Sequence, residues 1–111
     1  MQPAGSRLSL RMSTNAREIP WRPSPAAPRV HLKDLGDSGD WSLLMMRYEA
    51  GASLPLGPGP LLLYVLEGEL IRDGRRLWPG VADSVAPGAA AEGRSEIGCV
   101  FLALRRVEVT R

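Results

Sequence analysis

The chain has 111 residues, of which 44% are hydrophobic and 23% are charged, and its net charge is +2. That length suits one domain, and the apolar fraction excludes a chain that is disordered throughout. No apolar run approaches the roughly 18 residues of a membrane span. The apolar run after Arg7 is only Leu8-Ser9-Leu10, far short of the roughly 7–15 apolar residues of a secretory signal. A single cysteine, Cys99, excludes an internal disulfide and suits a reducing compartment. We therefore expect a cytoplasmic protein without a membrane partner.

The basic residues are concentrated at the start of the chain. Residues 1–33 hold six basic side chains and one acid, whereas residues 34–111 hold eight arginines and eleven acids. Residues 1–18 lack hydrophobic periodicity, and we interpret them as a flexible basic tail before a single folded domain, residues 19–111. Because the folded part is mildly acidic, we expect no nucleic-acid partner.

Short strands separated by turns are predicted along the folded part. The strand at residues 41–49 has apolar side chains on both faces, so it must be covered on both sides, as in a barrel or sandwich. Asp73-Gly74 is a strong signal for a two-residue hairpin. The predicted strands are, in chain order, residues 30–35, 41–49, 61–66, 69–72, 75–78, 83–86 and 98–109. Their spacing indicates an all-β barrel or sandwich, and no segment predicts a helix.

Two stretches of the sequence resemble the paired motifs of the cupin superfamily. Gly51 stands where the first motif opens, and residues 64–70 (YVLEGEL) resemble its closing hairpin. Gly80 and Gly88 occupy the two glycine positions of the second motif. The resemblance implies a small single-domain cupin, a jelly-roll-like β-barrel of the RmlC type.

Three further segments resemble one branch of that superfamily, the cupin domain of bacterial zinc-dependent anti-sigma factors. They are the lead-in that begins at Trp21, residues 44–47 (LMMR), and residues 95–104. The whole resemblance covers about residues 20–107. It brings a regulatory role into consideration beside the enzyme activities for which cupins are known.

The positions that hold a metal in the family carry no metal ligand in this chain. By the resemblance, the two histidines of the first motif fall on Gly57 and Gly59, its glutamate on Leu61, and the histidine of the second motif on Ala91. These side chains offer no lone pairs to a metal. The whole chain contains one histidine, so we expect no metal site and no cofactor.

Without its ligands, the former metal position becomes a small apolar pocket that a small organic molecule can fill. If Leu61 points inward like the glutamate it replaces, alternation turns Leu63 and Val65 inward and Tyr64 outward. Arg47 either faces inward, as an anchor for a carboxylate or phosphate, or faces outward and pairs with Glu49. The predicted pocket residues are Met45, Arg47, Gly57, Gly59, Leu61, Leu63, Ala91 and Phe101.

Two weak candidates for catalysis are His31 and Arg47. His31 can act as an acid or base near neutral pH, but in a strand at residues 30–35 it can equally face solvent or a dimer neighbour. Cys99 has no second histidine to activate it, which favours a role as a small buried hydrophobic residue.

Three functions follow from these observations. The first is a metal-free cupin that binds a small organic molecule and has a regulatory role. The second is a metal-independent enzyme, a cyclase, isomerase or dehydratase, and the third is a stand-alone relic of an anti-sigma sensor that contacts a protein partner. The shortage of polar residues for the pocket favours the first. We also expect a homodimer, formed through the sheet edge at Val30–Leu35.

Overall fold

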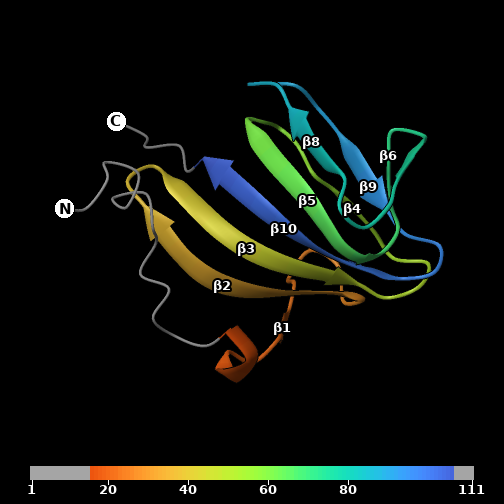
Figure 1. Cartoon of the computed structure of the whole chain (residues 1–111), viewed down its shortest axis with the longest axis horizontal. Coiled ribbons are helices and arrows are strands. Elements are labelled where there is room, and N and C mark those ends of the chain that lie inside the picture. Colours follow the sequence, from red (N-terminus) through yellow and green to blue (C-terminus); the bar gives the residue numbers. More distant parts are fainter. Residues whose placement is uncertain (1–15, 107–111) are drawn as a thin grey trace.

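The structure of the chain, a computed structural model, describes residues 16–106. In this range ten strands form two antiparallel sheets, preceded by a 3-10 turn, η2 (Ala16–Glu18). The six-stranded sheet has the order β1 (Arg22–Pro23), β2 (Val30–Ser38), β3 (Trp41–Tyr48), β10 (Cys99–Arg106), β5 (Leu61–Gly68) and β8 (Ala82–Val85). The four-stranded sheet has the order β4 (Ser53–Pro55), β9 (Glu92–Arg94), β6 (Leu70–Arg72) and β7 (Arg75–Leu77). In Figure 1 the long strands β2, β3, β10 and β5 run side by side, with β4, β6 and β9 beyond them.

The all-β prediction is confirmed, and the seven predicted strands correspond to β2, β3, β5, β6, β7, β8 and β10. The last of them was predicted to reach residue 109, and residues 107–109 lie outside the described residues. The hairpin prediction is also confirmed, because Asp73 and Gly74 have φ angles of 50° and 85° between β6 and β7. The two-residue β1 and the three-residue β4 and β9 were not predicted. Ser53–Pro55 and Glu92–Arg94 have no alternating pattern of their own, and they become strands by pairing with each other.

The first sheet edge differs from the prediction. Of the predicted tail, residues 1–15 lie outside the described residues, and Ala16–Glu18 form η2. β1 pairs with β2 at Leu32 and His31, and the Nζ of Lys33 donates to the carbonyl oxygen of Ala16 at 3.0 Å. β2 is therefore an inner strand, and the Val30–Leu35 segment is not the free edge on which the expected dimer contact was based.

The hydrophobic core lies between the two sheets. The alternation predicted for β5 is confirmed: Leu61, Leu63 and Val65 are buried, whereas Leu62 and Tyr64 are 49% and 43% exposed. On β3 and β10, Tyr48 and Phe101 meet edge to face with ring centroids 5.4 Å apart. Every strand of the larger sheet from β2 to β8 thus presents one apolar face to the core.

Candidate functional site

An apolar cavity of about 300 Å³ opens between the two sheets, beside the start of β5 and the end of β10. Its size lies at the lower end of the roughly 300–1,000 Å³ range of small-molecule sites. The walls come from the inner faces of β2, β3, β5 and β10 and from two loops, one after β1 and one that includes β4. The lining residues are Leu32, Leu44, Met46, Leu61, Ala103 and Arg105 from the sheet, and Ser24, Pro25, Ala26, Leu54, Pro55 and Leu56 from the loops.

Arg105 is the one charged residue among the described residues of this lining. Side chains alternate along β10, and because Phe101 and Ala103 point into the core, Arg105 points to the same side at the mouth of the cavity. Its cross-strand partners are Ser42 on β3 and the cavity residue Leu61 on β5. Among residues 16–106 no carboxylate lies within ion-pair distance of its guanidinium.

The neighbouring Arg106 shows the opposite arrangement. Its side chain points to the outer side of β10, and its cross-strand partner on β3 is Trp41. Its guanidinium lies 3.8 Å from the carboxylate of Asp40. Six further arginines of the described range also have carboxylate partners; they are Arg22, Arg29, Arg72, Arg75, Arg76 and Arg94. Within the described range, Arg105 is thus a cation without a carboxylate partner at an apolar opening.

Ser24 is the second polar side chain of the cavity and is buried. Its backbone amide donates to the carbonyl oxygen of Val30 at 2.8 Å, and its hydroxyl oxygen accepts from the amide of Ala26 at 3.2 Å. That hydroxyl–amide contact is a serine turn, which fixes the loop after β1. Within the described part of the chain the hydroxyl proton has no acceptor, so it is available to a bound molecule.

Backbone fills the positions where the family resemblance places histidines. The amides of Leu56 and Gly57 both donate to the carbonyl oxygen of Ala91, at 2.8 and 3.2 Å, and the amide of Gly59 donates to that of Ala89 at 3.1 Å. A Cβ atom on Gly57 would lie 2.7 Å from the oxygen of Ala89, closer than real Cβ contacts. Any side chain at residue 57 therefore requires the backbone to move.

The residues present do not fit a metal. The four positions implied by the resemblance hold Gly57, Gly59, Leu61 and Ala91, and none of them has a donor side chain. Nowhere in residues 16–106 do three histidine, cysteine, aspartate or glutamate side chains cluster as a metal would require. These positions therefore support no reaction step that uses a metal.

The predicted pocket residues are dispersed in the structure. Leu61 lines the cavity, whereas Leu63, Ala91 and Phe101 are buried in the core beside it. Gly57 and Gly59 pack on the backbone of the loop between β8 and β9. Met45 and Arg47 lie on the outer face of β3, because alternation turns Met46 and Tyr48 into the core. Met45 was expected in the pocket and lies outside it, whereas the direction of Arg47 had been left open, because β3 is apolar on both sides.

Arg47 and His31, the weak catalytic candidates, are cross-strand neighbours on this outer face, away from the cavity. The guanidinium of Arg47 lies 5.1 Å from the centroid of the Trp21 ring. The Nε2 of His31 lies 2.7 Å from a carboxylate oxygen of Glu49, and this hydrogen bond lowers the pKa of Glu49 below its usual value. Neither side chain can reach a molecule bound between the sheets.

Cys99 lies in the core, and burial raises the pKa of its thiol to about 11. The thiol is therefore neutral near pH 7 and is a poor nucleophile. This agrees with its interpretation as a small buried side chain.

The most strongly bonded polar group is Glu69, which sequence reasoning missed. Its side chain is fully buried, and one carboxylate oxygen accepts from the Glu96 amide at 2.8 Å. The Ser95 hydroxyl lies 2.9 Å from the same oxygen and 2.6 Å from the backbone carbonyl oxygen of Glu69, so the two acceptors share its proton. The other carboxylate oxygen accepts from the guanidinium of Arg76 at 2.5 Å. Burial alone would raise the pKa of Glu69, but these hydrogen bonds, a longer one from the Ile97 amide and the charge of Arg76 together lower it. The cluster joins the β6–β7 hairpin to the β9–β10 connection.

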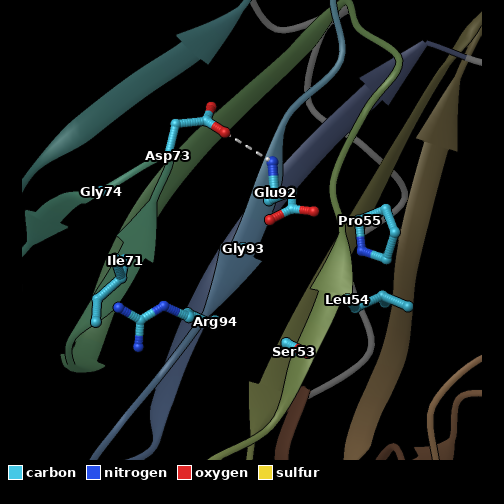
Figure 2. A pocket seen from close by; sticks show the side chains of 9 residues that line it. All are labelled: Ser53, Leu54, Pro55, Ile71, Asp73, Gly74, Glu92, Gly93 and Arg94. Carbon is cyan, nitrogen blue, oxygen red and sulfur yellow. Dashed lines mark hydrogen bonds between the residues drawn. The ribbon is translucent and has the colours of Figure 1, made fainter.

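A second hollow of about 200 Å³ lies on the four-stranded sheet. Figure 2 shows Asp73 and Glu92 toward one end, Arg94 and Ile71 toward the other, and residues 53–55 along the opposite wall. Asp73 accepts a hydrogen bond from the Glu92 amide at 3.2 Å, and Arg94 is paired with Glu96 at 3.1 Å. Its charged groups are thus engaged with the chain itself or exposed to solvent, so we assign no site to it.

No protein-family model matches the sequence, and no curated protein matches it either. Solved structures do match. An RmlC-like cupin from Shewanella frigidimarina NCIMB 400 has a TM-score of 0.73 at 16% identity, over 86% of this chain and 89% of that one. The polyketide cyclase RemF from Streptomyces resistomycificus has a TM-score of 0.66 at 19% identity, over 88% of this chain and 86% of that one.

A chain of the Rhodobacter sphaeroides complex of SigE with the anti-sigma ChrR also matches, with a TM-score of 0.70 at 17% identity. The match covers 95% of this chain and 57% of that one. It agrees with the resemblance to anti-sigma cupin domains found in the sequence. At these identities the likeness concerns the fold, and the chain has the RmlC-like cupin fold.

Proposed function

We propose that this protein binds a small organic molecule, without a metal, in the cavity between its two sheets. The observation that carries the proposal is the combination of an apolar cavity of about 300 Å³ with one unpaired arginine and one serine at its wall. Apolar walls with a few placed polar groups are typical of small-molecule sites. A regulatory role would follow if the bound molecule changes what the outer surface contacts.

The cavity favours binding over catalysis. An enzyme that works through acid–base chemistry needs a group that titrates near neutral pH beside its substrate. Among the described lining residues there is no histidine, aspartate, glutamate, lysine, cysteine or tyrosine that could supply such a group. The third function, contact of a sensor relic with a protein partner, is supported by likeness of fold alone.

The test is a titration with trans-cinnamamide, a compact neutral molecule, followed by the methyl signals of Leu32, Leu44, Met46 and Leu61. We expect saturable shifts with a dissociation constant of about 1 mM or tighter, which corresponds to about −4 kcal/mol. Ala103→Leu, which fills part of the cavity from β10, should weaken binding at least about tenfold. Ala90→Leu, at an exposed alanine outside the lining, is the matched control.

Absence of saturable shifts, or shifts that Ala103→Leu leaves unchanged, would overturn the proposal. Because the added methyl groups can disturb the core, Leu44→Phe provides a second filled variant, and the amide spectrum of each variant verifies that it is folded.

We place this activity in the cytoplasm, because the one cysteine is a free thiol. Residues 16–106 contain no helix with the length and hydrophobicity to cross a membrane.

A further inference from the structure

The polar side chains that line the cavity are all hydrogen-bond donors. Arg105 has five N–H groups and no acceptor, and the hydroxyl of Ser24 accepts one hydrogen bond from the Ala26 amide and keeps its proton to donate. The other ten lining residues have apolar side chains, and none of the twelve is an aspartate, glutamate or histidine. This wall favours a molecule that presents an acceptor, and one with a negative charge satisfies Arg105 best.

We propose that the cavity selects small organic acids, in which a compact apolar body fills the space and a single carboxylate binds Arg105. This inference rests on the proposed function and names the ligand class of the same site. A carboxylate matches the planar guanidinium in a bidentate geometry. Leu61, the cross-strand partner of Arg105, gives the apolar body a wall directly beside that charge.

The effect of the charge should be moderate, because Arg105 lies at an exposed mouth. A bidentate bond between charged groups at the edge of an apolar site should favour an acid over the matching neutral amide by about tenfold or more. Arg105→Gln should remove that preference while leaving the apolar contacts in place. Arg105→Lys, which keeps the charge but not the planar fork, should retain part of it.

The experiment compares trans-cinnamate with trans-cinnamamide by calorimetry at pH 7 on the intact chain. Arg106→Gln is the matched control, because Arg106 is the next residue on β10 but faces outward toward Asp40. We expect cinnamate to bind at least about tenfold more tightly, the preference to vanish in Arg105→Gln, and Arg106→Gln to behave as the unaltered chain.

The other possible outcomes distinguish failure of the organic-acid inference from failure of the proposed function. Equal binding of acid and amide, both weakened by Ala103→Leu, would overturn the organic-acid inference and leave the proposed function standing. Binding of cinnamate that depends on Arg105 but not on Ala103→Leu would show an anion held at the surface, and would overturn both. Absence of binding by either compound would also overturn both.

A different observation concerns the outer face of the six-stranded sheet, where three neighbouring strands present apolar side chains. β10 lies between β3 and β5, so each outward residue of β10 has one partner on either side. Leu62 and Tyr64 are exposed and the other apolar side chains of this face are partly exposed, and contiguous apolar surface of this kind marks contact sites. The two apolar rows, read from β3 through β10 to β5, are Leu43, Leu104 and Leu62, then Met45, Leu102 and Tyr64.

The next row of the same face carries opposite charges on its two sides. Val100 on β10 pairs with Arg47 on β3 and with Glu67 on β5. Neither charged residue has an ion-pair partner among residues 16–106, although Arg47 also lies against Trp21. If two copies face each other across a two-fold axis parallel to β10, the β3 side of one sheet lies opposite the β5 side of the other. This arrangement would therefore set Arg47 of one copy opposite Glu67 of the other.

We infer that this face binds a second copy of the chain, sheet against sheet, with the two apolar rows at its centre and two Arg47–Glu67 pairs beside them. Such a contact is isologous, as closed dimers require. It replaces the Val30–Leu35 edge, which β1 covers, as the route to a homodimer.

The test is sedimentation equilibrium at concentrations up to about 1 mM, where even a weak specific dimer is populated. We expect a dimer, and we expect Arg47→Glu or Glu67→Arg alone to weaken it at least about tenfold through like-charge contact. The double exchange should restore it, and Glu92→Arg on the other sheet is the control. A monomer throughout, or single exchanges without effect, or a double exchange that fails to restore the dimer, would overturn this inference.

Discussion

Removal of the Glu69 carboxylate should be one of the most damaging single changes to this fold. The side chain is 0% exposed and receives hydrogen bonds from Ser95, from the amides of Glu96 and Ile97, and from Arg76. Glu69→Ala would leave the amides of Glu96 and Ile97 without this acceptor and create a cavity, whereas the Ser95 hydroxyl keeps the backbone carbonyl of residue 69 and Arg76 can turn to solvent. Hydrogen bonds to a buried charge are worth about 1.5–3 kcal/mol each and do not add fully, so we expect a loss of about 3–5 kcal/mol.

The assay is urea denaturation at pH 7, with stability read from the midpoint at a constant slope. Glu69→Gln keeps the volume of the side chain and should lose less, about 1–3 kcal/mol, which keeps the measurement readable if the alanine variant does not fold. Glu96→Gln is the matched control, because the Glu96 carboxylate also pairs with Arg76 but is half exposed, and its midpoint should barely move. A loss below about 1 kcal/mol in Glu69→Ala would refute the reasoning.

The same carboxylate gives stability a defined dependence on pH. The pKa of Glu69 in the folded chain lies below its ordinary value of 4.5. The unfolded chain therefore binds a proton first as the pH falls, so the stabilisation is complete above about pH 4.5 and is lost as the pH drops through the folded-state pKa. Between pH 7 and pH 3 the urea midpoint of the unaltered chain should fall more steeply than that of Glu69→Gln. Parallel curves would contradict this assignment.

Three further predictions concern the core and the former metal position. Elemental analysis of the purified protein should find no stoichiometric transition metal, and about one metal per chain retained through chelator treatment would contradict the analysis of Gly57, Gly59, Leu61 and Ala91. Leu61→Glu should cost much less than Leu63→Glu, because a carboxylate at residue 61 faces Arg105, whereas one at residue 63 lies between Ala103 and Asp83 and should cost about 3–5 kcal/mol. Equal losses of stability for the two variants in urea denaturation would show that a carboxylate at residue 61 does not reach Arg105. The Cys99 thiol, with a pKa of about 11, should react with a disulfide reagent at pH 7 about a hundredfold more slowly than in the unfolded chain, and an undiminished native rate would refute its burial.

The parts of the fold that the sequence predicted are those set by neighbouring residues. Asp73-Gly74 forms the hairpin because both positions need positive φ, and β5 alternates because only one of its faces meets the core. β4 and β9 could not be predicted, since each is held in place by a partner about forty residues away along the chain.

The candidate site was predicted less completely, for a physical reason. Arg47 belongs to a strand with two apolar faces, so periodicity could not assign its direction. Arg105 had a readable signal, because Cys99, Phe101 and Ala103 alternate inward before it, but this required knowing which face of β10 meets the core. Glu69 and Ser95 are 26 residues apart, and only the assembled fold brings them together.

The backbone contacts at residues 57 and 59 also bear on the history of this protein and on its redesign. A methyl group added to Gly59 would overlap the carbonyl groups of Val85 and Ala86, and one on Gly57 would press against Ala89. A histidine therefore cannot be introduced at either position by a single substitution, because its Cβ atom would overlap backbone atoms and the backbone would have to move. A designer who wishes to return a metal to this barrel must lengthen the segment between Gly51 and Leu61 first and choose ligands afterwards.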